Sequence, residues 1–129
     1  MSAPAPETRI EQTPEWLLVH ARGVFALAWF KQLIQQAIAA AQTSVPPARA
    51  MLLDLREVTG ARMSDMDRYD LGVLAARDSV GAPIAMVGPE TLVDPRRFGE
   101  VVARNRGLNV RVFTDMDEAT AWLRSFTKT

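Results

Sequence analysis

Apolar and polar positions along the chain form alternating blocks of strand type and helix type. The run Ala50–Leu55 is almost continuously apolar, which is typical of a strand covered on both faces and therefore of a parallel sheet. Pro83–Val87 has the same character, and Asn109–Phe113 alternates with the two-residue period of a strand. Trp16–Ala21 is rich in strand-forming residues, and Arg9–Gln12 is predicted as its hairpin partner. We therefore expect a sheet of four to five strands.

Four segments between or after these strands have the length and apolar spacing of amphipathic helices. They run from Val24 to Gln42, from Ser64 to about Gly81, from Asp94 to about Gly107, and from Thr114 onward. Ser64 is predicted to cap the second helix, with Asp67 as its capping-box partner. Strands that alternate with helices are joined by right-handed crossovers, so the predicted fold class is α/β with a mostly parallel, mixed sheet.

The helix predicted over Val24–Gln42 carries an apolar band wider than one sheet face covers. Two stripes with helical spacing lie side by side: Leu27, Phe30, Ile34, Ile38 and Ala41, and next to them Trp29, Leu33, Ala37 and Ala40. Either the helix is wedged between two layers of its own molecule, or the second stripe contacts a partner. In the second case Phe25, Trp29 and Leu33 form an interface through which the chain self-associates as a homodimer.

Length and composition restrict the class of protein. A chain of 129 residues is one domain, which we expect to span residues 9–129 behind a flexible arm of residues 1–8. Fifteen basic and fifteen acidic side chains balance, so no overall field attracts nucleic acid. The sequence shows neither a secretory signal nor a run long enough to span a membrane, and we expect a cytoplasmic protein.

Residues able to carry catalysis are sparse. The chain has no cysteine and one histidine, His20, which makes no standard metal site by itself. No Gly-x-Ser-x-Gly turn, glycine-rich phosphate loop or EF-hand pattern is present. We predict no catalytic residue, no metal and no cofactor, and an enzyme is the least favoured class.

Three segments resemble the SpoIIAA-like branch of the STAS and CRAL-TRIO-like superfamily: Met51–Gly60, Ile84–Pro89 and Val110–Asp115. The resemblance implies a regulatory, protein-binding domain. In antagonist-type members of this family, an Asp-Ser-Ser-Gly motif carries a phosphorylated serine. Alignment places Met63 at that serine and Ser64 at the next one, so the resemblance does not imply the usual phosphorylation switch here.

In open α/β sheets, ligands bind beyond the carboxyl ends of the strands, where helix N-termini present free N–H groups. We predict that a small anion or a partner loop binds at this rim, with Arg56 or Arg62 as the counter-charge. The candidate rim residues are Arg56, Arg62, Ser64, Asp65, Gly88, Thr114 and Asp115.

Two functional hypotheses follow. The first is a non-enzymatic regulatory or interaction domain that binds a protein partner and self-associates. The alternative is a carrier of a small apolar or lipid ligand in a cleft of the α/β core, for which the Met- and Leu-rich helices are suited.

Overall fold

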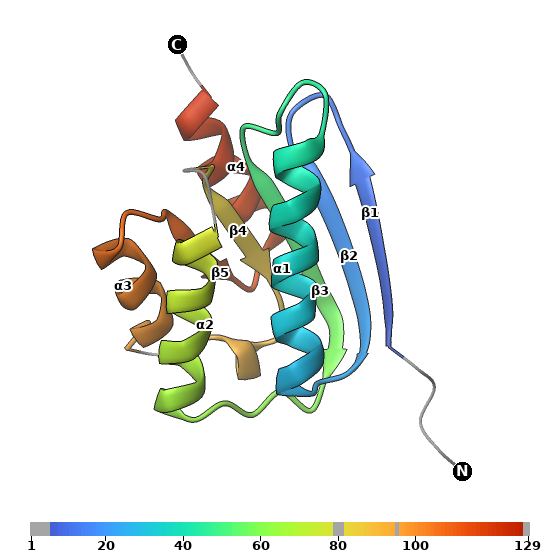
Figure 1. Ribbon diagram of the computed structural model, residues 1–129. Coiled ribbons are helices and arrows are strands. Elements are labelled where there is room, and N and C mark those ends of the chain that lie inside the picture. The colour runs from blue at the N-terminus through green and yellow to red at the C-terminus, as the bar shows by residue number, and fades with distance from the viewer. Residues whose placement is uncertain (1–5, 79–81, 95, 128–129) are drawn as a thin grey trace.

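The computed structural model describes residues 6–78, 82–94 and 96–127. Its centre is a five-stranded sheet with the order β1-β2-β3-β4-β5, as Figure 1 shows. Strands β2 to β5 are parallel, and β1 pairs antiparallel with β2 as the predicted hairpin. The strands are β1 (Glu7–Gln12), β2 (Leu17–Val24), β3 (Met51–Thr59), β4 (Ile84–Val87) and β5 (Val110–Phe113). The predicted fold class is confirmed.

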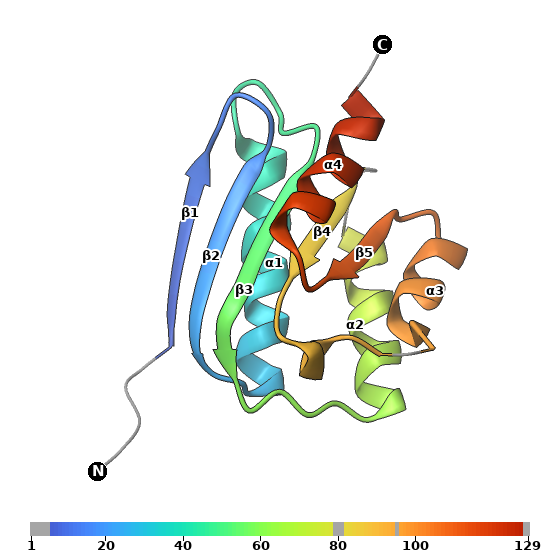
Figure 2. The same ribbon diagram turned by 180° about the vertical axis from the view of Figure 1, so that it is seen from behind.

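The helices divide unequally between the two faces of the sheet. Helices α1 (Leu27–Thr43), α2 (Asp65–Asp78) and α3 (Phe98–Asn105) lie on one face, and α4 (Met116–Thr127) lies on the other (Figures 1 and 2). A short 3-10 helix, η1 (Glu90–Leu92), follows β4. Helix α4 lies over β4, β5 and the beginning of β3, so on that side no described helix covers β1, most of β2 or the second half of β3 (Figure 2).

Successive side chains of β2 and β3 point to opposite faces of the sheet, which divides the core into two clusters. Leu17, Val19 and Leu53 point toward α1 and belong to the larger cluster. Trp16 and Leu52 point to the opposite face and pack with residues of α4 in the smaller one. Since both faces of β3 are buried over Met51–Leu55, this part of its sequence is an almost continuous apolar run.

Helix α1 is wedged within its own molecule. Leu33 and Ala37 are each 1% exposed and belong to the same cluster as the residues of the sheet-facing stripe. Phe25 and Trp29 are half-buried against that cluster, and the Phe25 ring lies 5.4 Å from that of Phe30. The expectation of an exposed interface that includes Leu33 is therefore wrong, because α2 and the sheet together cover this part of the helix.

Several element boundaries differ from the prediction. Glu7 and Thr8 pair with Arg22 and Ala21 in the β1–β2 ladder, so the predicted arm of residues 1–8 is too long by these two; its residues 1–5 lie outside the described residues. Strand β2 continues to Val24, which delays α1 to Leu27.

The two C-terminal helices begin later than predicted. Helix α3 starts at Phe98 rather than near Asp94, and Arg97 precedes it in the left-handed region with a φ of 52°. At α4 the side chain of Asp115, not Thr114, accepts the N–H of Glu118 at 3.3 Å and acts as the cap.

None of the described helices is long and apolar enough to cross a membrane.

Candidate functional site

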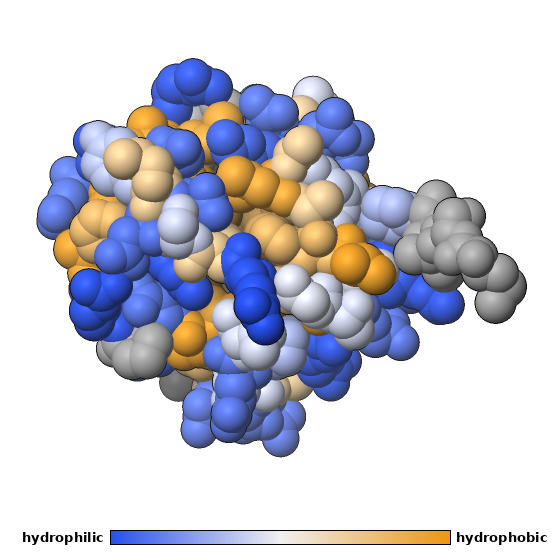
Figure 3. Space-filling model, turned by 90° about the horizontal axis from the view of Figure 1, so that it is seen from below, coloured by the Kyte–Doolittle hydropathy of each residue, from blue (hydrophilic) through white to orange (hydrophobic). Residues whose placement is uncertain are grey.

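The parallel strands all end at one edge of the sheet, which we call the carboxyl rim (residues 60–65, 88–94, 96–98 and 114–115). Helices α1, α2 and α4 begin at this edge, and η1 lies there as well (Figure 1). Figure 3 shows the molecule from this end, with an apolar band across the centre and hydrophilic side chains around it. The rim thus combines the N-termini of three helices with exposed apolar surface.

Ser64 is the N-cap of α2, as predicted. Its Oγ accepts the N–H of Asp67 at 3.0 Å, and an Asp67 carboxylate oxygen accepts the N–H of Ser64 at 3.1 Å. This reciprocal pair is the capping box expected from the sequence. The next residue, Asp65, accepts a hydrogen bond from Arg96 at 2.7 Å, which links the start of α2 to the segment before α3. The hydroxyl of Ser64 is therefore exposed but already engaged in the fold.

Gly88 and Arg62 also lie at the rim, in different environments. Gly88 is buried, and its N–H donates to the carbonyl of Phe113 at 2.9 Å. A Cβ at this position would meet the Cδ1 methyl of Leu92, so a larger residue would have to displace that side chain of η1. Arg62 is exposed, and among the described residues it has no hydrogen-bond or ion-pair partner. Arg62 is thus the predicted counter-charge that remains available to a ligand.

Arg56 is not available in the same way, because it folds back on Asp54 within β3. Its Nε and Nη2 donate to the two carboxylate oxygens of Asp54, both at 2.8 Å, and its backbone N–H donates to Oδ1 at 3.2 Å. His20 Nδ1 lies 3.2 Å from Asp54 Oδ2 across the β2–β3 ladder. The structure therefore moves Arg56 from the predicted rim into a cluster with His20 and Asp54, on the part of the α4 side of the sheet that no described helix covers.

The Asp54 carboxylate is buried, with 7% of the residue exposed. Burial raises its pKa, but the hydrogen bonds from Arg56 and the charges of Arg56 and His20 outweigh burial, so the pKa of Asp54 lies below its usual value. Asp54 is thus an ionised residue within the apolar run Ala50–Leu55. Its position in an apolar run gives no signal of this role in the sequence.

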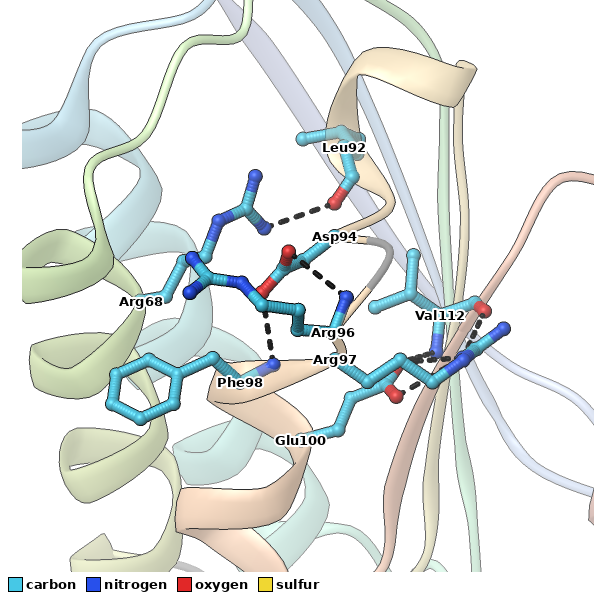
Figure 4. Close-up of polar contacts among 8 residues, drawn as sticks. All are labelled: Arg68, Leu92, Asp94, Arg96, Arg97, Phe98, Glu100 and Val112. Carbon is cyan, nitrogen blue, oxygen red and sulfur yellow. Dashed lines mark hydrogen bonds and ion pairs between the residues drawn. The ribbon is translucent and has the colours of Figure 1, made fainter.

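A second polar cluster that the sequence analysis missed joins α3 to β5 (Figure 4). Arg97 Nη1 lies 3.0 Å from both carboxylate oxygens of Glu100 and 3.1 Å from the carbonyl of Val112, while the Val112 N–H donates to Glu100. Glu100 is only 5% exposed. The two side chains therefore satisfy the backbone groups that Val112 directs away from β4, and they take the place of a sixth strand at this edge.

Asp94 organises the turn before α3 (Figure 4). Its carboxylate accepts the N–H of Phe98 at 2.9 Å and that of Arg96 at 3.2 Å. The hydrogen bond from Phe98 is the largest cause that holds the pKa of Asp94 below its usual value. Although α3 begins four residues after Asp94, this carboxylate accepts the first N–H of the helix, that of Phe98.

A cavity of about 80 Å³ lies between the sheet and helices α1, α2 and α3. Most of its lining is apolar, from residues such as Phe30, Leu55 and Leu71, and its polar side is formed by Arg68, Asp94, Arg97 and Glu100. Two of these are cations and two are anions, so the mouth has no dominant sign of charge. No group of three or more His, Asp or Glu residues within 6–78, 82–94 and 96–127 is placed to hold a metal ion.

The comparisons with known proteins agree on the architecture. One similar structure is an anti-sigma factor antagonist from Mycobacterium paratuberculosis, with a TM-score of 0.60 and 15% identity over 96% of this chain and 99% of the other. A second is an uncharacterised protein of the DUF3478 family from Shewanella loihica PV-4, described as having a SpoIIAA-like fold. It has a TM-score of 0.50 and 21% identity over 95% and 98% of the two chains.

The fold is SpoIIAA-like. No protein-family model matches the chain, and no curated protein matches it by sequence. Within this SpoIIAA-like fold, the position that the resemblance aligns with the phosphorylated serine is Met63, which is half-buried against the larger core cluster. A methionine has no hydroxyl group to accept a phosphate, so only the capping Ser64 offers one at the start of α2.

Proposed function

We propose that this chain is a non-enzymatic regulatory domain of the cytoplasm that binds a protein partner through α2, α3 and the adjoining carboxyl rim. The observation that carries the proposal is the distribution of exposed apolar side chains. Of the eight large apolar residues that are exposed in the described part of the chain, four lie on these two neighbouring helices: Met66, Tyr69, Phe98 and Val101. We call this group the α2–α3 patch.

The members of the patch range in exposure from 37% at Phe98 to 66% at Met66. Met66 is 66% exposed in the first turn of α2, although the buried side of that helix offers apolar contacts around Leu71 and Ala75. Exposed apolar side chains that gather on one surface and are rimmed by charge are typical of protein–protein interfaces. The neighbouring Asp65–Arg96 pair and the free Arg62 provide a polar margin for such an interface.

The structural neighbour from Mycobacterium paratuberculosis supports the same class of function, because an anti-sigma factor antagonist acts through a protein partner. The alternative, a carrier of a small apolar or lipid ligand, has weaker support. The cavity of about 80 Å³ is small beside cavities of about 150 Å³ that accept benzene.

The test is a capture experiment with the full chain as bait in an extract of the organism that encodes it. Met66→Asp and Phe98→Asp place a charge in the patch, while Val45→Asp places one on an apolar residue that is 90% exposed in a loop. We expect one protein to be retained by the wild type and by Val45→Asp and lost with both patch variants. Circular dichroism spectra establish that all variants are folded.

Equal retention by all four baits would contradict binding through the patch. Native mass spectrometry of the same preparations examines the alternative, since a co-purifying apolar ligand would favour a carrier.

A further inference from the structure

The two edge strands of the sheet, β5 and β1, differ in whether their outward backbone groups are already hydrogen-bonded. At β5, Glu100 and Arg97 occupy the outward N–H and C=O of Val112, which leaves that edge closed to another strand. At the other edge, all six residues of β1 are exposed, and no described element lies beside the strand (Figure 1). An edge strand of this kind can accept a further strand.

The hairpin determines which backbone groups of β1 face the open edge. The Thr13 N–H donates to the carbonyl of Trp16 at 3.0 Å, next to the Gln12–Leu17 pair. Hydrogen-bonded and non-hydrogen-bonded pairs alternate in an antiparallel ladder. Arg9 and Glu11 therefore bond to β2, while Thr8, Ile10 and Gln12 direct their N–H and C=O groups outward.

We propose that β1 pairs antiparallel with β1 of a second copy of this chain, about a twofold axis at Ile10. This register joins only outward-facing residues, Thr8 with Gln12 and Ile10 with Ile10. On the face shared with His20 and Leu18, it sets Arg9 of each copy opposite Glu11 of the other. Two pairs of opposite charge therefore flank the axis, and the two sheets become one.

The other symmetric registers are less favourable. If the axis lies at Arg9, the Arg9 side chains of the two copies face each other, and Glu7 of each copy faces Glu11 of the other. If the axis lies at Glu11, the two Glu11 side chains face each other. Like charges directly opposite each other destabilise a strand pair. A register centred on Thr8 brings Ile10 opposite Pro6, which has no N–H to donate. Only the axis at Ile10 combines opposite charges with a full set of donors.

The pairing involves a short strand from each copy, so the contact lies at the low end of interface sizes. We therefore expect a reversible monomer–dimer equilibrium rather than an obligate dimer. The inference goes beyond the proposed function, because β1 and the α2–α3 patch lie on opposite sides of the molecule (Figure 1). A variant of one surface leaves the other intact.

The experiment is sedimentation velocity of the full chain from low micromolar to near-millimolar concentration. Wild type should shift toward twice the monomer mass as the concentration rises. Arg9→Glu and Glu11→Arg each set like charges opposite one another and should weaken dimerisation by about fivefold or more. The double variant Arg9→Glu/Glu11→Arg and an equimolar mixture of the two single variants restore opposite charges, and both should dimerise again.

Glu7→Gln serves as the control, because Glu7 lies on the same face of β1 as Arg9 and Glu11 but outside the residues that pair between the copies. The dimerisation of this variant should match that of the wild type. A wild type that remains monomeric over the whole range would overturn the proposal. So would a dimer that is indifferent to both single variants, or one that the mixture does not restore.

Discussion

The carboxylate of Asp54 accepts the backbone N–H of Arg56, two residues further along β3, at the point where the register with β2 shifts. His20 pairs with Asp54, but the next matched pair is Arg22 with Glu57, so β3 carries one extra residue there. A bulge of this kind leaves an N–H outside the ladder. Asp54 Oδ1 accepts that N–H at 3.2 Å, and the Arg56 guanidinium then pairs with the buried charge. The bulge and the buried carboxylate thus form one structural unit.

Stability should therefore depend on pH through Asp54. The pKa of this group is lowered in the folded chain, so its contribution is fully present above the unfolded value of about 3.9 and is lost as pH falls through the folded pKa. Asp54→Asn should lower the free energy of unfolding at pH near 7 by about 1–3 kcal/mol. Urea titrations should show that this difference shrinks as pH falls below about 4.

Asp70→Asn is a suitable control for the loss of one negative charge, since Asp70 lies outside both polar clusters. If the difference between Asp54→Asn and wild type stayed constant down to strongly acidic pH, the carboxylate would not be the ionised partner that the contacts indicate.

Glu100 should be essential for keeping the β5 edge closed. Glu100→Ala removes the acceptor of the Val112 N–H and leaves Arg97 without its carboxylate partner, so we expect the free energy of unfolding to fall by about 2–4 kcal/mol. An opened edge also invites intermolecular pairing, and light scattering should show faster aggregation. Glu118→Ala, at an exposed position of α4, should change stability by less than about 0.5 kcal/mol.

Ser64 should behave as a cap whose hydroxyl is replaceable by a carboxylate. Ser64→Ala removes the acceptor of the Asp67 N–H and should cost about 1 kcal/mol of folding free energy in urea denaturation. Ser64→Asp retains an acceptor and adds negative charge at the N-terminus of α2, so its stability should stay close to that of the wild type. If Ser64→Ala were as stable as the wild type, the capping box would contribute nothing measurable.

The fold was predictable because its signals are local. The apolar run of β3, the proline- and glycine-bounded β4 and the capping box at Ser64 each lie within a few residues, and they specified the strands, the topology class and the start of α2. Contacts between residues that are far apart in the sequence were not predictable. Leu33 could not be assigned to the core from its stripe alone, because the same pattern fits a wedged helix and a dimer interface.

The Glu100 cluster shows why the candidate site was harder to predict than the fold. A helix counted from Asp94 places Phe98 and Val101 on its apolar face, yet both are exposed. Arg97 adopts a left-handed conformation, which ends the preceding turn and delays the helix to Phe98. This shift turns Glu100 and Ala103 inward, where Glu100 meets Val112, twelve residues along the chain. The positive φ of Arg97 cannot be predicted from the spacing of apolar residues in the sequence.

That angle leads to a final prediction for Arg97. A non-glycine residue in the left-handed region costs about 1–2 kcal/mol, and glycine avoids most of this cost. Arg97→Ala and Arg97→Gly both remove the guanidinium that pairs with Glu100, so both should be less stable than the wild type. The two variants differ in the cost of the positive φ at residue 97, which alanine bears and glycine avoids. Arg97→Gly should therefore be the more stable of the two by about 1 kcal/mol in urea denaturation. The reverse order would mean that Arg97 does not hold a positive φ in solution, and that α3 begins earlier, as its sequence pattern suggests.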